Sequence, residues 1–215
     1  DFKVSAENPV WVITFVSGGG KGNAPRLKEA ASRLAAVDEA DVNRIKVDKI
    51  AWWKDMWTRS YVETNDSLLN RQYLSSIYLL ASAYNRRSPV SGGMYGVWNM
   101  DDEMMYHGDI HLNYNSQGGF YSVFSANRPE IALPFYKSLE LLIPEGKRRA
   151  REEAGKVHKS LEGKSYRGIL FPVGALGIGE FYNYYWQQTM DAPFNVPLFS
   201  WYYEYTGDKD FLRDH

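Results

Sequence analysis

The chain has 215 residues, and its 25 Lys and Arg side chains against 26 Asp and Glu side chains give a net charge of −1. Proteins that neutralise nucleic-acid phosphates normally carry a basic excess, so the charge balance argues against a nucleic-acid partner. No run reaches roughly 18 consecutive apolar residues, and no membrane span is predicted. The absence of cysteine excludes disulfides, thiolate metal sites and cysteine nucleophiles.

The first part of the chain predicts strands followed by helices. Residues 2–5 and 10–16 are β-branched and aromatic, which favours strands that end at the glycines of 18–20. No Gly-Lys-Ser/Thr follows, so this glycine run is a connection and not a phosphate-binding loop. Apolar residues then recur at helical spacing over 25–35 and 42–61.

A third helix is the clearest, because Asn65 or Asp66 can cap it and an apolar stripe runs from Leu69 to Ala81. The segment 86–108 breaks the helical pattern with proline, glycines and an acidic cluster, and loops of this length are usually functional or disordered. Helices are predicted again over 110–126 and 129–143, followed by a solvated helix over 144–162.

The last third contains a glycine-rich section at 166–179 and an aromatic zone at 181–205, which we assign mainly to the core. Thr206-Gly207-Asp208 predicts a helix end, a turn and the N-cap of a new helix with Phe211 and Leu212. The chain stops one turn into that helix, so we expect a truncated domain.

The segment 106–117 is the most polar stretch flanked by apolar helices. Asn113, Asn115 and Gln117 stand at alternate positions, and buried amides need several partners each. The cluster therefore indicates either a polar ligand or a hydrogen-bond network at a helix start. Neither a Gly-x-Ser-x-Gly motif of serine hydrolases nor the His-Glu-x-x-His motif of zinc proteases is present.

The order of several motifs resembles glycoside hydrolase family 95, the α-L-fucosidases and related enzymes. The resemblance rests on Gly96-Val97-Trp98-Asn99, on Asn113-Tyr114-Asn115-Ser116-Gln117 and on Thr206-Gly207-Asp208 with Phe211-Leu212. It implies a mainly α fold, a partial (α/α)6 toroid preceded by a short β remnant of a sandwich domain. The implied domains are the β remnant at 1–24, linker helices at 25–62 and the N-terminal half of the toroid at 63–215.

The resemblance also implies roles for residues. Asn115 would be the amide base that handles the attacking water, and Asn113 would help to position that water. The residues expected to bind the substrate are Trp98, Asn99, Gln117, Tyr106 and His107. An amide is a weak base alone, so an aspartate would polarise it and a glutamate would be the general acid, both expected beyond residue 215. The anticipated substrate is an oligosaccharide or glycan, with no cofactor, and the expected location is periplasmic or extracellular.

Two alternatives remain. A non-catalytic carbohydrate-binding or scaffold module with the same fold is possible, because no pair of catalytic carboxylates is evident and fold does not fix function. A metal-dependent hydrolase is a weaker alternative, because His107 and His111 are four residues apart with Asp109 between them.

Overall fold

The computed structural model describes residues 12–14, 24–94, 96–98, 101, 103–153, 155, 160, 162, 166–176, 179–181 and 188–215. The chain divides into two compact units, Asp1–Arg59 and Ser60–His215, and each is described by itself. The strands expected in 2–5 and 10–16, and with them the β remnant, lie outside the described residues apart from 12–14, which form no regular element.

The first unit contains the two helices expected from the sequence, α1 (Ala24–Ala35) and α2 (Glu39–Arg59). The Asp38 carboxylate accepts a hydrogen bond from the Asp41 amide at 2.8 Å, which satisfies one of the free N–H groups in the first turn of α2. Farther along α2, the rings of Trp53 and Trp57 stack at 5.6 Å. Both predicted helices are confirmed, and α2 begins three residues earlier than expected.

The second unit begins with α3 (Ser67–Ala83), whose predicted cap is also confirmed. The Asp66 carboxylate accepts hydrogen bonds from the amides of Leu68 and Leu69 at 2.8 and 3.2 Å. A short polar side chain in an extended conformation before the first turn is the usual way to satisfy these donors.

The continuous helix predicted over 110–126 is wrong. The segment forms the strand β1 (Ile110–His111), a turn, and two short helices, α4 (Asn115–Gly118) and α5 (Tyr121–Ser125). Gly118 and Gly119 separate the short helices, and glycine lowers helix propensity. Ile110 and His111 pair with a strand more than sixty residues away, which a local pattern does not reveal.

The helices predicted over 129–143 and 144–162 are confirmed as helical up to Glu152, but the break expected between them at Pro144 is wrong. A 3₁₀ turn, η2 (Pro129–Ala132), leads into α6 (Leu133–Glu152), a single helix that runs through Pro144. The far end of α6 is not merely solvated, because Gly146, Arg149 and Ala150 are buried there.

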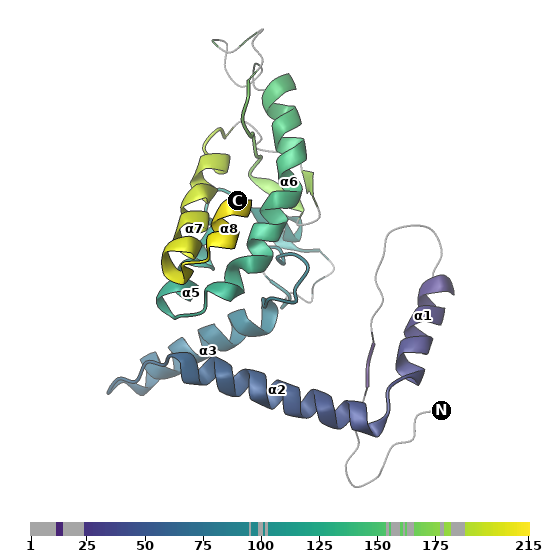
Figure 1. Ribbon diagram of the computed structural model, residues 1–215. Coiled ribbons are helices and arrows are strands. Elements are labelled where there is room, and N and C mark those ends of the chain that lie inside the picture. The colour runs from purple at the N-terminus through teal and green to yellow at the C-terminus, as the bar shows by residue number, and fades with distance from the viewer. Residues whose placement is uncertain are drawn as a thin grey trace. The chain divides into compact units, whose positions relative to one another are not determined.

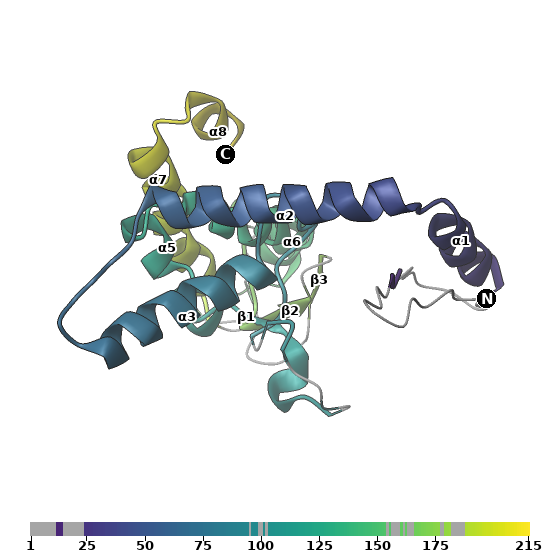
Figure 2. The ribbon, with the colours of Figure 1, turned by 90° about the horizontal axis from the view of Figure 1, so that it is seen from below.

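A small antiparallel sheet lies within the second unit, and the sequence did not predict it. The strand order is β1-β2-β3, with β2 (Gly174–Leu176) in the centre and β3 (Glu180–Phe181) on its other side. Ile110 faces Ala175 across the first pair, and Ala175 faces Phe181 across the second. Figure 2 shows the three strands together.

The core of this unit forms where α6 meets α7 (Asp191–Thr206) and α8 (Lys209–Asp214), which lie side by side in Figure 1. The Tyr136 hydroxyl on α6 donates to the Leu198 carbonyl on α7 at 2.7 Å. The Phe211 ring on α8 packs against both Tyr136 and Tyr202, at 5.3 and 4.2 Å. Asp208 caps α8 as predicted, through the Phe211 amide at 2.9 Å.

The described residues are mainly helical, so the predicted fold class is confirmed as mostly α. None of the helices within these residues is both long and apolar enough to cross a membrane.

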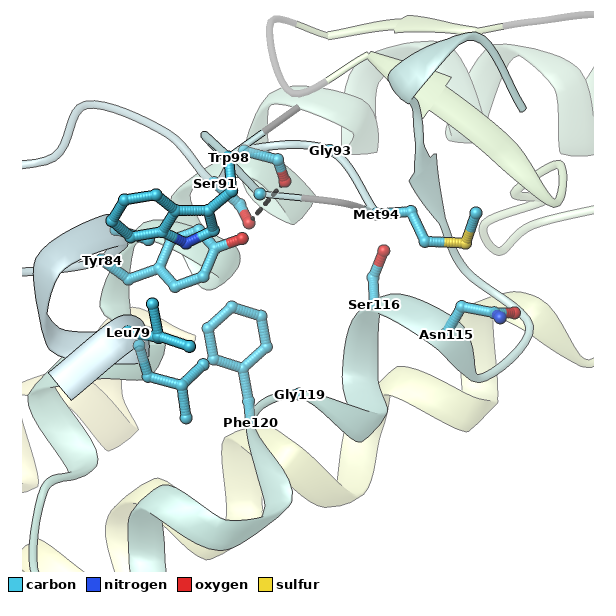
Figure 3. Close-up of a pocket in the computed structure, with 14 residues that line it drawn as sticks. Leu79, Tyr84, Ser91, Gly93, Met94, Trp98, Asn115, Ser116, Gly119 and Phe120 are labelled. Atoms are coloured by element: carbon cyan, nitrogen blue, oxygen red, sulfur yellow. Dashed lines mark hydrogen bonds between the residues drawn. The ribbon is translucent and has the colours of Figure 1, made fainter. Parts of the chain in front are cut away.

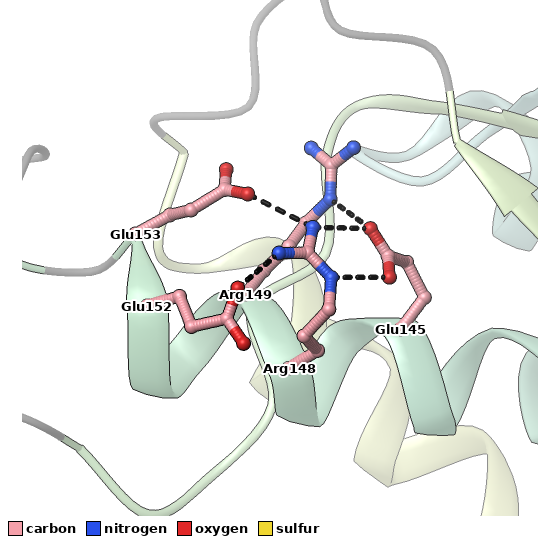
Figure 4. Close-up of polar contacts among 5 residues, drawn as sticks. All are labelled: Glu145, Arg148, Arg149, Glu152 and Glu153. Atoms are coloured by element: carbon pink, nitrogen blue, oxygen red, sulfur yellow. Dashed lines mark hydrogen bonds and ion pairs between the residues drawn. The ribbon is translucent and has the colours of Figure 1, made fainter.

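An ion-pair cluster at the far end of α6 is held around Glu145, as Figure 4 shows. Arg148 donates to both Glu145 oxygens, each at 2.7 Å, and Arg149 donates to one of them at 2.9 Å. Arg148 also contacts Glu152 and Glu153. The hydrogen bonds from Arg148 lower the pKa of Glu145 to about 2 from 4.5.

This cluster predicts a pH-dependent contribution to stability. An acid whose pKa is lower in the folded state stabilises the fold above its ordinary pKa and loses that effect as the pH falls. The unfolding free energy lost in Glu145→Gln is therefore expected to be largest above pH 4.5 and to vanish toward pH 2. Because the pairs are partly exposed, we expect about 1 kcal/mol.

Urea unfolding of the wild-type protein and of Glu145→Gln, from pH 2 to above pH 4.5, measures this difference in unfolding free energy. Asp210→Asn is the control, because Asp210 is paired with Arg213 but 83% exposed, and a smaller loss is expected there. A Glu145→Gln difference that does not change with pH would contradict the assignment.

Close packing at Gly146 generates a second stability prediction. A Cβ at this position would lie 2.7 Å from Ile169 and 2.8 Å from Phe171. Gly146→Ala should therefore lower the free energy of unfolding by about 1–3 kcal/mol, despite the better helix propensity of alanine. Gly119→Ala is the control, since its Cβ would come no closer than 3.7 Å to Ser116, and it should leave thermal and urea midpoints unchanged or higher.

Candidate functional site

A cavity of about 220 Å³ opens within the second unit, between the end of α3, the loop that follows it, and α4. The residues that line it are Leu79, Leu80, Ala83, Tyr84, Ser91, Gly92, Gly93, Met94, Gly96, Trp98, Asn115, Ser116, Gly119 and Phe120. Aliphatic and aromatic side chains form most of its wall, whereas Asn115 and Ser116 supply polar groups. In Figure 3, Trp98 and Tyr84 lie at one end, Asn115 at the other, and Phe120 between them.

The loop that carries Trp98 is held close to the start of β1. The Met94 amide donates to the Asp109 carbonyl at 2.6 Å, and the Ser91 amide donates to the Ser138 hydroxyl on α6 at 2.9 Å. A Cβ on Gly93 would lie 1.6 Å from the Gly108 carbonyl oxygen, so only glycine permits this approach. The long loop is therefore anchored at its base, while the Trp98 ring is half exposed.

Tyr84 forms the inner edge of the cavity. Its side chain is buried, and its ring packs against Phe120 at 5.2 Å. Burial raises the pKa of the phenol, and a hydrogen bond with Ser91 opposes that shift. Tyr84 therefore stays a neutral hydroxyl at the edge of a mostly apolar wall.

The turn between β1 and α4 carries both candidate amides and an unusual backbone conformation. Tyr114, between Asn113 and Asn115, has φ 146° and ψ −45°, a backbone conformation that residues other than glycine rarely adopt. The Asn115 side chain is exposed and lines the cavity. The Asn113 side-chain oxygen is buried and makes no hydrogen bond.

Gln117 lies directly beneath this turn and is fully buried. Its Nε2 donates to the Leu112 carbonyl and, at 3.0 Å, to Oδ1 of Asn195 on α7. Its Oε1 accepts the Tyr114 amide at 3.1 Å. Asn195 in turn donates from Nδ2 to the Asp191 carbonyl at 2.6 Å. Two buried amides thus connect the turn to α7.

A second polar group contains two buried carboxylates near one histidine. His111 Nδ1 lies 3.0 Å from Asp109 Oδ1, and burial raises the pKa of Asp109 against this hydrogen bond. Both carboxylate oxygens of Asp191 are buried without a hydrogen bond. Burial raises the pKa of Asp191 to about 6, and the charge on His111 opposes the shift.

The residues expected to form the site are only partly brought together. Trp98 and Asn115 line one cavity, and Asn113 lies two residues from Asn115 on the adjoining turn. Tyr106 and His107 lie in the 3₁₀ turn η1 (Met105–Gly108) with left-handed φ values of 52° and 59°, outside the cavity lining. Asn99 lies outside the described residues.

Two of these residues contact other groups of the protein. The exposed Tyr106 ring packs edge-on against His111 at 5.2 Å. Gln117, expected to bind substrate, does not line the cavity, and its amide contacts protein atoms.

Three residues of these networks, Tyr84, Asp191 and Asn195, were not predicted from the sequence. Tyr84 stands at the end of a predicted apolar helix, where it was indistinguishable from a core residue. Asp191 and Asn195 are spaced one helical turn apart inside an aromatic zone assigned to the core, and two polar side chains on one face of such a helix are the signal that indicates a buried network.

The metal alternative finds no support in the described part of the chain. Within it, no three His, Asp or Glu side chains are grouped so as to bind a metal ion. His107 is exposed, whereas His111 is buried and hydrogen-bonded to Asp109.

Comparison with known proteins agrees with this arrangement. No curated protein shows significant similarity to the chain. The model of the glycosyl hydrolase family 95 catalytic domain, however, matches residues 40–215, which include all but the first residue of α2, every element of the second unit and the whole cavity. A mostly helical chain with this match is consistent with a partial helical toroid. The chain therefore belongs to glycoside hydrolase family 95 and is a glycosidase catalytic domain, or part of one, that acts on a glycan.

Proposed function

We propose that this protein is an inverting α-L-fucosidase-like enzyme in which Asn115 handles the attacking water and Asn113 helps to position it. The observation that carries the proposal is the shared cavity. Trp98 and Asn115 come from two separate motifs, yet both line it. An aromatic ring and an amide at opposite ends of one cavity suit a sugar, which presents an apolar C–H face and polar hydroxyls.

The wall of the cavity supports a deoxy sugar as the substrate. Leu79, Leu80 and Phe120 provide an aliphatic and aromatic surface that offers no hydrogen bonds. A hydroxymethyl group placed there would lose its hydrogen bonds to water, whereas the methyl group of a 6-deoxyhexose would be buried favourably. The volume of about 220 Å³ is below that of drug-sized ligand pockets, and it suits one sugar ring.

The proposed chemistry needs two carboxyl groups besides the amides. In an inverting hydrolase the acid protonates the leaving oxygen, and the base activates water on the opposite face of the sugar. Among the described residues, no Asp or Glu lines the cavity. On this proposal, the carboxylate that polarises Asn115 and the general acid come from positions beyond residue 215. We also propose a periplasmic or extracellular location.

Replacement of Asn115 tests the proposed role directly. In the full-length protein, Asn115→Ala should lower kcat on an α-L-fucoside by about 10²–10⁴-fold, the range typical of lost acid–base assistance. Folding should be little affected, because the side chain is exposed. Steady-state kinetics and thermal unfolding of both proteins measure the two effects.

Asn43→Ala is the matched control, since Asn43 is an exposed asparagine on α2, outside the cavity. Wild-type turnover in Asn115→Ala would contradict the proposed role. Fucoside binding without turnover in the wild-type protein would favour the carbohydrate-binding module instead.

Trp98 provides a prediction on binding. If its half-exposed ring stacks on the sugar, Trp98→Ala should raise KM about three- to tenfold, because aromatic stacking contributes roughly 0.5–1.5 kcal/mol. The KM of Trp98→Phe should lie between that of the wild-type protein and that of Trp98→Ala. Tyr61→Ala is the control, because Tyr61 is an exposed aromatic residue that does not line the cavity. An unchanged KM in Trp98→Ala would exclude stacking.

A further inference from the structure

We infer that Gln117 and Asn195 are positioning residues that hold the strained Tyr114 turn, and through it the two candidate amides, in the geometry needed for hydrolysis. This inference rests on the proposed function of Asn113 and Asn115. It assigns Gln117 a role different from direct substrate binding, and it gives a role to Asn195, a residue of α7 that does not line the cavity.

The backbone at Tyr114 requires something to hold it. Its φ of 146° is unfavourable for any residue with a Cβ, and such conformations persist only where the surroundings over-determine them. Relaxation of this residue would rotate the peptide groups on either side of it. Those peptide groups join Tyr114 to Asn113 and to Asn115, so both amide side chains would move.

Gln117 supplies hydrogen bonds on both sides of Asn113. Nε2 donates to the Leu112 carbonyl, before Asn113, and Oε1 accepts the Tyr114 amide, after it. The Gly118 amide also donates to the Tyr114 carbonyl at 2.8 Å. Since Gln117 is fully buried, an apolar side chain of the same size would leave the Leu112 carbonyl and the Tyr114 amide without these partners.

Asn195 fixes the orientation of the Gln117 amide. Its Nδ2 donates to the Asp191 carbonyl, so its Oδ1 must face Gln117 as an acceptor. Gln117 must therefore present Nε2 to Asn195 and to Leu112, which leaves Oε1 for the Tyr114 amide. With its oxygen and nitrogen exchanged, Gln117 would put oxygen against two acceptors. One orientation alone satisfies all of these groups.

The first test uses Gln117→Met, which keeps the size of the side chain but removes its hydrogen bonds. In the full-length enzyme we expect kcat on an α-L-fucoside to fall ten- to a hundredfold, with KM changed less than threefold. Amide hydrogen exchange over 110–119 should be faster, because the Tyr114 amide loses its acceptor. Asn195→Ala, a truncation outside the cavity, should lower kcat in the same direction.

The decisive test is rescue by glycine at position 114. Glycine tolerates a φ of 146°, so Tyr114→Gly in the Gln117→Met background should recover kcat at least fivefold. Tyr114→Ala in the same background is the matched control. It removes the same ring but keeps the strain, and it should give no recovery. Equal behaviour of the glycine and alanine variants would overturn the inference, as would a rise in KM alone in Gln117→Met.

Failure of the proposed function gives a different result. If the wild-type protein does not turn over any α-L-fucoside, the proposed function falls, and the positioning role falls with it. If the wild type is active but Gln117→Met has wild-type kcat and unchanged exchange at 110–119, only the positioning role is overturned.

Discussion

The Tyr114 backbone is the constraint on which the polar end of the cavity depends, because its φ of 146° is unfavourable and needs surrounding contacts to hold it. Gln117 accepts the Tyr114 amide hydrogen bond, and Asn195 on α7 orients the Gln117 side chain. The position of α7 depends in turn on the core, where the Tyr136 hydroxyl of α6 bonds the Leu198 carbonyl. The polar end of the cavity is therefore connected through hydrogen bonds to the aromatic core formed by α6 and α7.

The two ends of the cavity are supported differently. Trp98 lies on a long loop that is anchored at its base by the Met94 amide and the close approach of Gly93, yet its ring is half exposed. Asn115 lies on a short helix fixed by buried hydrogen bonds. A site with one rigid and one less confined end suits a reaction in which the water must be placed accurately while the sugar ring enters and leaves.

Local signals predicted much of the fold, whereas distant pairings could not be predicted. The caps at Asp66 and Asp208 involve residues two or three positions apart, so the sequence displays them directly. Gln117 and Asn195 are 78 positions apart, and β1 pairs with a strand beyond α6. The motif at 113–117 located the polar turn, but it did not distinguish Asn115, which lines the cavity, from Gln117, which lies beneath it.

The buried Asp191 carboxylate, in the first turn of α7, lowers the stability of the fold. A carboxylate without hydrogen bonds resists ionisation, and its pKa of about 6 means that the fold loses stability as the pH rises from 3.8 through 6. Two features reduce that cost, the position of Asp191 in the first turn of α7 and the nearby charge of His111. The same turn supplies the carbonyl that accepts Asn195 Nδ2. The turn that buries an unfavourable carboxylate thus also orients the amide that holds the Tyr114 turn.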